Sequence, residues 1–99
     1  MRNILIIGAG KSSSSLIKYL LDKSSLENIH IKIGDISIDE NSKRYQNQPN
    51  LTVIELDIFN ETQRVEAIQK ADIVISMLPA RFHLEVAKDC IQFQKNMVT

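Results

Sequence analysis

The sequence predicts an α/β fold: a doubly wound parallel sheet of strand order 3-2-1-4-5, covered by helices on both faces to give three α/β/α layers. Short β-branched apolar runs alternate with segments whose apolar residues recur at helical spacing. No hairpin signal joins any two of the apolar runs. Strands that are linked through helices pair in parallel by right-handed crossovers, and this sheet order follows for the doubly wound class.

The first half of the chain predicts two strands around a helix. Residues 3–7 are apolar at nearly every position, as expected of a central strand that is covered on both faces. In residues 11–23 the apolar side chains recur every three or four positions, which indicates a helix with one buried face. Residues 29–33 alternate isoleucine with polar residues and predict the second strand. The polar stretch over residues 36–48 predicts a loop or a short, weakly packed helix.

The third strand is predicted over residues 51–56, and a helix over residues 61–70 follows it. Asn60 stands immediately before this helix, where its side chain can cap the first free backbone amides. We expect Val65 and Ile68 to face the core from the helix.

The last part of the chain predicts a fourth strand, a helix and the start of a fifth strand. Residues 71–77 are nearly all apolar, so this strand is expected beside the first one in the centre of the sheet. The helix over residues 81–93 is expected to bury one face, formed by Val86, Ala87, Cys90 and Ile91. Residues 96–99 predict a fifth strand that is truncated by the end of the chain.

Length and charge restrict the classes of function. Residues 1–99 make one domain, too small to hold both a cofactor domain and a substrate domain, so any enzyme interpretation concerns part of a longer enzyme. Twelve basic residues balance twelve acidic ones without a basic stripe, so nucleic acid is not an expected partner. The first apolar run stops at Gly8, too short for a signal peptide or a membrane span, which predicts a cytoplasmic protein without membrane contact. One cysteine, expected to be buried and unreactive, excludes a multi-cysteine metal site, and no metal is expected.

The stretch "IIGAGKSSSS" admits two interpretations. It contains Gly10, Lys11 and Ser12, the order that ends the phosphate loop of many ATPases and GTPases. That loop needs another glycine five positions before Gly10, and the residue there is Leu5, in the middle of the first predicted strand. The triphosphate interpretation is therefore rejected.

The same stretch fits a dinucleotide-binding turn at two of its three glycines. Gly8 permits the tight turn, Gly10 lets the backbone approach a pyrophosphate, and Ser13 takes the place of the third glycine. The helix that follows directs free amides and its positive end at the same point. We therefore expect a Rossmann-like turn that binds a dinucleotide mostly through its backbone.

Asp35 follows the second strand about 25 positions after Gly10, near the spacing of about 20 that this fingerprint predicts. A carboxylate there accepts hydrogen bonds from both ribose hydroxyls of NAD and repels the additional phosphate of NADP. The alternative is that Asp35 only ends a strand in a turn.

Three further polar residues have two interpretations each. Lys11 either points to solvent or lies over the phosphates. Asp57, with its neighbour Ile58, either reaches an adenine edge or serves as a turn and cap residue. His83, near the start of the last helix and on its inward side, is either a structural hydrogen-bonding group or a catalyst.

Two segments, "ILIIGAGKSSSSLIKYLL" and "ADIVISMLPARFHLEVAKDCIQFQKNMVT", together resemble the N-terminal cofactor domain of saccharopine dehydrogenases and saccharopine reductases. The second segment carries the more specific pattern, VIS-x-LP-x-x-x-H-x-x-VA-x-x-CI followed by NMVT. The resemblance spans the whole chain and is weakest over residues 36–49. It implies an oxidoreductase of lysine metabolism that moves a hydride between a nicotinamide cofactor and a secondary amine joining lysine to a dicarboxylic acid.

The resemblance also assigns residues to parts of the cofactor. It implies contacts to the pyrophosphate, the adenosine ribose, the adenine and the nicotinamide side. The residues are Gly8, Gly10, Lys11 and Ser12 for the pyrophosphate, Asp35 for the adenosine ribose, Asp57 and Ile58 for the adenine, and Ser76, Met77, Leu78 and Pro79 for the nicotinamide side. The family's substrate-binding and proton-transferring residues lie mostly in a later domain, so no catalytic residue is placed on this chain and the chain alone is expected to be inactive.

The nucleotide preference follows from one departure. NADP-using members tend to have a small polar or basic residue where this chain has Asp35, which favours NAD. The candidate contacts to the additional phosphate of NADP are Ser37, Lys43 and Arg44.

Two other functions fit parts of the sequence. A regulatory nucleotide-sensing domain of the potassium-channel type also opens with a GxGxxG turn and an acidic second-strand end, but it does not predict the Leu78–Pro79 break or His83. A structural module that binds nothing leaves the glycine turn unexplained. As an isolated chain, such a module would expose the edge of its fifth strand, which a second copy could cover in a homodimer.

Overall fold

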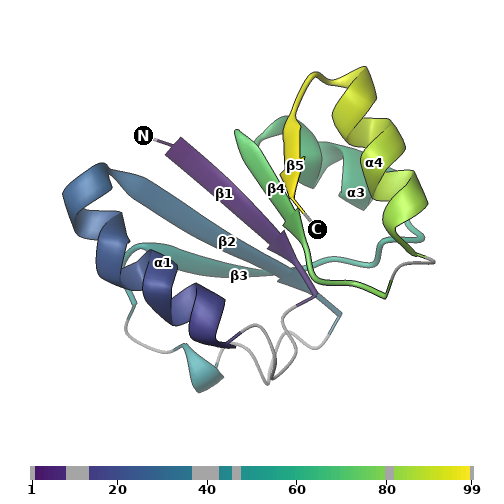
Figure 1. Ribbon diagram of the computed structural model, residues 1–99. Helices are drawn as coiled ribbons and strands as arrows, with labels where there is room; N and C mark the ends of the chain where they lie inside the picture. The colour runs from purple at the N-terminus through teal and green to yellow at the C-terminus, as the bar shows by residue number, and fades with distance from the viewer. Residues whose placement is uncertain (1, 9–13, 37–42, 46–47, 80–81, 99) are drawn as a thin grey trace.

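The computed structural model describes residues 2–8, 14–36, 43–45, 48–79 and 82–98 (Figure 1). Its labelled elements alternate between strand and helix, except that β3 comes next after β2 among the labels. They are β1 (Arg2–Ile7), α1 (Ser14–Glu27), β2 (Ile29–Asp35), β3 (Leu51–Glu55), α3 (Glu61–Gln69), β4 (Ile73–Ser76), α4 (His83–Gln92) and β5 (Asn96–Val98). None of the helices in these ranges is long and apolar enough to cross a membrane.

The strands form a parallel sheet of order β3-β2-β1-β4-β5, which confirms the predicted topology. β1 lies in the centre, and its Ile4 is paired with Ile31 of β2 on one side and Ile73 of β4 on the other. The winding direction of the sheet reverses between β1 and β4.

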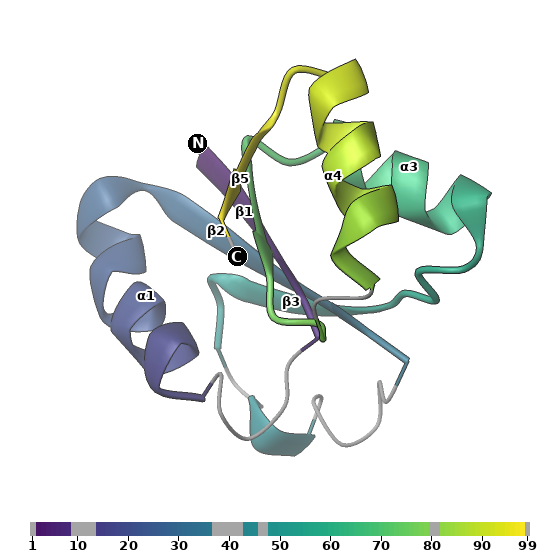
Figure 2. The same cartoon turned by 45° about the vertical axis from the view of Figure 1, so that its right-hand side comes forward.

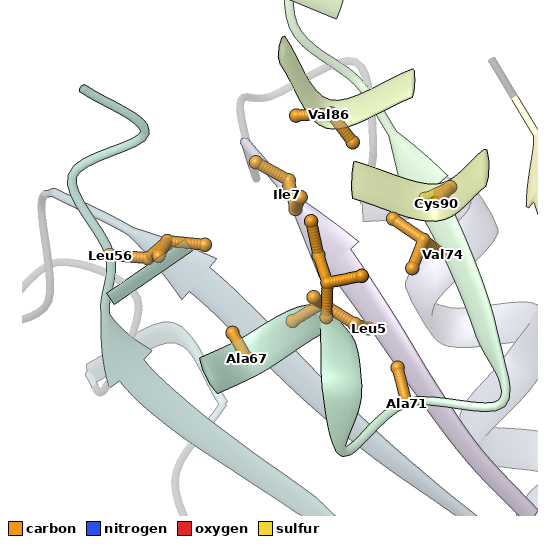
Figure 3. Packing of buried hydrophobic residues seen from close by; sticks show 9 residues of the cluster. Leu5, Ile7, Leu56, Ala67, Ala71, Val74, Val86 and Cys90 are labelled. Atoms are coloured by element: carbon orange, nitrogen blue, oxygen red, sulfur yellow. The ribbon is translucent and has the colours of Figure 1, made fainter. Parts of the chain in front are cut away.

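Helices cover both faces of the sheet (Figures 1 and 2): α1 lies on one face, and α3 and α4 lie on the other. Successive side chains of β1 alternate between two cores. Ile4 and Ile6 pack with Ile17 of α1, whereas Leu5 and Ile7 belong to the cluster under α3 and α4 that Figure 3 shows. The three layers predicted from the sequence are thus present.

Some element boundaries differ from the prediction. α1 continues to Glu27, four residues beyond the predicted end, and Asn28 ends it in a left-handed conformation with φ 55°. β2 includes Asp35, which was expected just beyond the strand. Within the stretch from 36 to 48, residues 43–44 are helical. The predicted cap is confirmed: the Asn60 side chain accepts a hydrogen bond of 3.1 Å from the Gln63 amide.

The buried faces of α3 and α4 were only partly predicted. Ile68 is buried as expected, but Val65 is only half-buried, and the charged Arg64 is buried instead. On α4, Val86 and Cys90 are buried, whereas Ile91 is 79% exposed. The prediction that Ile91 is buried was wrong, because the buried face of this short helix is narrower than the spacing of its apolar residues indicated.

Two glycines permit close contacts where the strands end. Gly8 has φ +80°, which side chains rarely adopt, and its amide donates to the carbonyl of Gly34 over 3.0 Å. A Cβ on Gly34 would lie 2.6 Å from Cδ2 and 3.1 Å from Cβ of Leu56. The backbone of β2 and the side chain of Leu56 can therefore approach only because position 34 lacks a side chain.

Replacing Gly34 with alanine should lower the free energy of unfolding by about 1–3 kcal/mol, because the new methyl group overpacks against Leu56. Urea unfolding of the wild type and Gly34→Ala measures the loss. In a Leu56→Ala background the clashing Cδ2 is gone and only the contact with Cβ at 3.1 Å remains, so adding Gly34→Ala there should cost clearly less. Equal costs in the two backgrounds would show that this contact does not explain the glycine.

Candidate functional site

A pocket of about 230 Å³ opens at the carboxyl ends of β1, β2 and β3, next to the loop that leaves β4. We call it the strand-end pocket. Its lining residues are Ile7, Gly8, Gly34, Asp35, Ile36, Leu56, Asp57, Ile58, Phe59, Leu78, Pro79 and Phe82. Ligands of doubly wound sheets bind at this edge, beside the point where the strand order reverses.

The pocket is mostly apolar and carries two carboxylates, those of Asp35 and Asp57. Its wall at Gly8 is tight, because a Cβ there would lie 3.0 Å from Cδ2 of Leu78, which would have to shift. A glycine at this first position permits the tight turn that a dinucleotide-binding site requires. The described residues therefore fit a dinucleotide.

Residues 57–60, which we call the pocket loop, are held by their own polar groups. The carboxylate of Asp57 accepts a hydrogen bond of 3.0 Å from the Phe59 amide, and its carbonyl accepts one of 2.9 Å from the Asn60 amide. The Asp57 amide donates to Oε1 of Gln63 on α3 over 3.0 Å. The turn role considered for Asp57 is thus observed, and the same residue lines the pocket.

The loop between β4 and α4 forms the facing wall. Ser76, which is buried, shares a hydrogen bond of 2.7 Å with Nδ1 of His83. The Phe82 amide donates to the carbonyl of Pro79 over 2.9 Å. The rings of Phe59 and Phe82 meet edge to face with centroids 5.5 Å apart, so the two walls touch across the pocket. The structure gives His83 a hydrogen-bonding role in holding this loop.

The structure brings together six of the residues predicted to bind cofactor. These six residues line the strand-end pocket: Gly8, Asp35, Asp57, Ile58, Leu78 and Pro79. Ser76 and Met77 do not line it, because Ser76 is buried against His83 and Met77 packs with the core on the α1 side. Gly10, Lys11 and Ser12 lie outside the described residues, as does Ser13 in the third glycine position.

Sequence reasoning missed the residues that shape the pocket rather than offer polar groups. Gly34 and Ile36 flank the predicted Asp35, and Leu56 and Phe59 flank the predicted pair Asp57 and Ile58. Their position next to strand ends was a usable signal. The contact of Phe82 with Phe59 joins residues 23 positions apart and had no local signature.

Arg64 and Asp89 were also missed, although both are buried at 7% exposure. Nε of Arg64 donates to Oδ2 of Asp89 over 2.5 Å, and Nη1 donates to the carbonyl of Ile58 in the pocket loop over 2.8 Å. The signal that could have found them is a charged residue on each helix at a position that faces inward with its apolar neighbours.

Other parts of the molecule are less suited to a cofactor. A wider hollow of about 720 Å³ lies at the opposite edge of the sheet, lined by Arg2, Glu27, Asn28, Ile29 and Asp72. The carboxylate of Asp72 is used there to accept a hydrogen bond of 2.7 Å from the Asn3 amide. Within the ranges that the structure describes, no group of three or more His, Cys, Asp or Glu side chains is placed to hold a metal ion.

Cys90 is buried at 2% exposure in the core under α4. Burial raises the pKa of its thiol, and the negative charge of Asp89 raises it further. The thiol is therefore protonated near neutral pH and behaves as an apolar core group, as expected from the sequence.

Comparison with known proteins agrees with this geometry. The model of a family described as "Saccharopine dehydrogenase NADP binding domain" matches residues 4–99. The mitochondrial alpha-aminoadipic semialdehyde synthase of Rattus norvegicus is 35% identical over 102 residues, which cover 99% of this chain and 10% of that protein. Saccharopine dehydrogenase (NADP(+), L-glutamate-forming) of Schizosaccharomyces pombe is 26% identical over 99 residues, covering 100% of this chain and 21% of that protein.

Solved structures share the fold. Apo saccharopine dehydrogenase (L-Glu forming) from Saccharomyces cerevisiae superposes with a TM-score of 0.85 at 21% identity, over 98% of this chain and 21% of that one. A Rossmann-fold NAD(P)-binding family protein from Shigella flexneri gives a TM-score of 0.81 at 24% identity, over 98% of this chain and 50% of that one.

These comparisons support the oxidoreductase interpretation and a nicotinamide dinucleotide as the cofactor, and they do not support the channel-type sensor. NADP is the nucleotide in the names of the family and of the fission yeast relative, so the preference for NAD drawn from Asp35 has no support. The chain spans about a tenth to a fifth of the length of these curated relatives. Because the family model covers nearly all of the chain, this protein belongs to the saccharopine dehydrogenase NADP-binding domain family.

Proposed function

We propose that this chain binds NADP or NADPH as the cofactor domain of an oxidoreductase that transfers a hydride at the C–N bond of an amino-acid-derived secondary amine. One observation carries the proposal: the strand-end pocket joins the bare backbone of Gly8, the carboxylate of Asp35 and the pocket loop at the reversal point of the sheet. This is where the doubly wound fold offers a dinucleotide its pyrophosphate, ribose and base contacts.

In this proposal, residues on the two walls of the strand-end pocket contact different parts of the cofactor. The backbone at Gly8 lies against the pyrophosphate, and Asp35 accepts hydrogen bonds from the adenosine ribose. The adenine ring packs beside Ile58, which lies with Asp57 in the pocket loop. Leu78 and Pro79 lead toward the nicotinamide side, and the Ser76–His83 hydrogen bond fixes the loop that carries them.

The nicotinamide ring supplies or accepts the hydride when the cofactor is bound. The residues of this chain bind and orient the cofactor, and the groups that bind the amine and move its proton are proposed to lie in another domain of a longer protein. The relatives are named alpha-aminoadipic semialdehyde synthase and saccharopine dehydrogenase. These names favour a substrate from lysine metabolism.

The preference for NADP needs a cation to offset Asp35, because a carboxylate beside the ribose repels the additional phosphate. Lys43 and Arg44 are exposed and follow β2 in the chain, and we propose that they attract this phosphate. The cytoplasmic location expected from the sequence is still a prediction. The mouse and rat relatives are named as mitochondrial proteins.

Calorimetric titration of the chain with NADPH, NADP, NADH, NAD and ATP tests the proposed function. We expect binding of the dinucleotides, with NADPH at least several-fold tighter than NADH and without comparable affinity for ATP. The pyrophosphate contacts are common to both dinucleotides, so the phosphate on the ribose decides the difference. Tight binding of ATP with no response to either dinucleotide would contradict the proposal.

Variants at the ribose end test the nucleotide preference. Asp35→Ala should tighten NADPH binding by about 1 kcal/mol, roughly fivefold, by removing a repulsive charge, and should weaken NADH binding by removing a ribose acceptor. The double variant Lys43→Ala/Arg44→Ala should weaken NADPH about two- to fivefold and leave NADH unchanged. Lys70→Ala is a matched control, since Lys70 is an exposed cation that directly follows α3 and is paired with Glu66. An equal loss of both nucleotides in the double variant would argue against the phosphate contact.

A further inference from the structure

Among the described residues, Arg64 and Asp89 are the charged side chains that are buried, each at 7% exposure. They come from α3 and α4, which lie next to one another on the same face of the sheet (Figures 1 and 2). Burial of a charged pair costs desolvation energy that apolar residues of similar size would not cost. Their presence at this position therefore calls for a reason other than helix packing alone.

The guanidinium of Arg64 connects three segments. Its Nε donates to Asp89 of α4, and its Nη1 donates over 2.8 Å to the carbonyl of Ile58, which lies just before α3 in the pocket loop. Its Nη2 lies 4.0 Å from Glu85, whose side chain is 53% exposed, so this third contact is long and screened by solvent. The short contacts are those to Asp89 and to the pocket loop.

An apolar pair could hold α3 against α4, but it could not orient a backbone carbonyl. The planar fork of arginine presents donors in a fixed geometry, so Asp89 on one side determines where Nη1 points on the other. Ile58 is fixed twice: its side chain packs on the core that contains Val86, and its carbonyl is held by Arg64. The remainder of the pocket loop is anchored at this point.

We propose that Arg64 is a positioning residue for the cofactor: held by Asp89, it fixes the Ile58 carbonyl and with it the wall of the strand-end pocket that receives the adenosine half. The inference rests on the proposed function for the identity of the ligand. Its structural part, the ordering of the pocket loop by Arg64, is measurable on the protein without any ligand.

The test compares three variants with the wild type. Arg64→Lys keeps a cation for Asp89 but cannot reach Asp89 and the Ile58 carbonyl with one fork. Arg64→Met/Asp89→Leu replaces the pair with apolar residues and leaves no unpaired buried charge, so it keeps a folded protein available for measurement. Ile29→Ala is the control, because Ile29 is buried in the core under α1, which does not contain Ile58, and lies at the opposite edge of the sheet from the strand-end pocket.

Two readouts are measured on each protein. Amide hydrogen exchange follows Phe59 and Asn60 of the pocket loop and Ile6 of β1. Affinity is measured separately for adenosine 2′,5′-bisphosphate, which represents the adenosine half, and for reduced nicotinamide mononucleotide, which represents the other half. In both Arg64 variants, the amides of Phe59 and Asn60 should exchange about tenfold faster relative to the amide of Ile6. Both variants should bind the bisphosphate about tenfold more weakly, and their affinity for the mononucleotide should not change.

The control should destabilise the protein without this selective pattern. If loop exchange relative to Ile6 in the Arg64 variants matches Ile29→Ala, the positioning role is overturned whatever the ligand results are. If loop exchange rises selectively but the two halves of the cofactor lose affinity equally, the link to the adenosine half is overturned. If the wild type binds neither dinucleotide nor bisphosphate, the proposed function fails, and the exchange data still decide the role of Arg64 in the loop.

Discussion

The burial of β1 on both faces is the constraint on which the remaining structure depends. Leu5, Ile6 and Ile7 are at most 1% exposed, and they alternate between the core under α3 and α4 and the core under α1. A strand with no polar face must be flanked by strands on both edges and covered by helices on both sides. β2 and β4 supply the edges, and the crossover connections place α1 on one face and α3 and α4 on the other.

The same strand determines where the site lies. Its hydrogen-bonding ladder continues past the last residue, since the Met77 amide donates to the Ile7 carbonyl over 2.8 Å and the Gly8 amide donates to Gly34. These bonds bring the exits of β1, β2 and β4 to one point, where Gly8 turns the chain with a positive φ. The pocket lies here, at the carboxyl ends of these strands and beside the point where the strand order reverses. Arg64 and the contact between Phe59 and Phe82 then hold its walls.

The sequence allowed the strand order, the Asn60 cap and most of the pocket's polar residues to be predicted, because each depends on local period or on position at a strand end. The buried pair Arg64–Asp89 was not predicted, because the two residues are 25 positions apart and the inward position of each on its helix does not by itself identify the partner. Ser76 does not line the pocket, because its hydroxyl shares a hydrogen bond with His83, seven positions later in the chain. The preference for NAD was drawn from the single carboxylate of Asp35, and the comparisons give it no support.

The central claim is that a dinucleotide binds at the carboxyl ends of β1, β2 and β3. The most direct measurement is a ¹H–¹⁵N spectrum of the labelled chain recorded during titration with NADPH. The account predicts that the largest shifts occur at Gly8, Gly34, Asp35 and Phe59, which line the strand-end pocket. Shifts centred on Arg2, Asn28 and Asp72, at the opposite edge of the sheet, would contradict it.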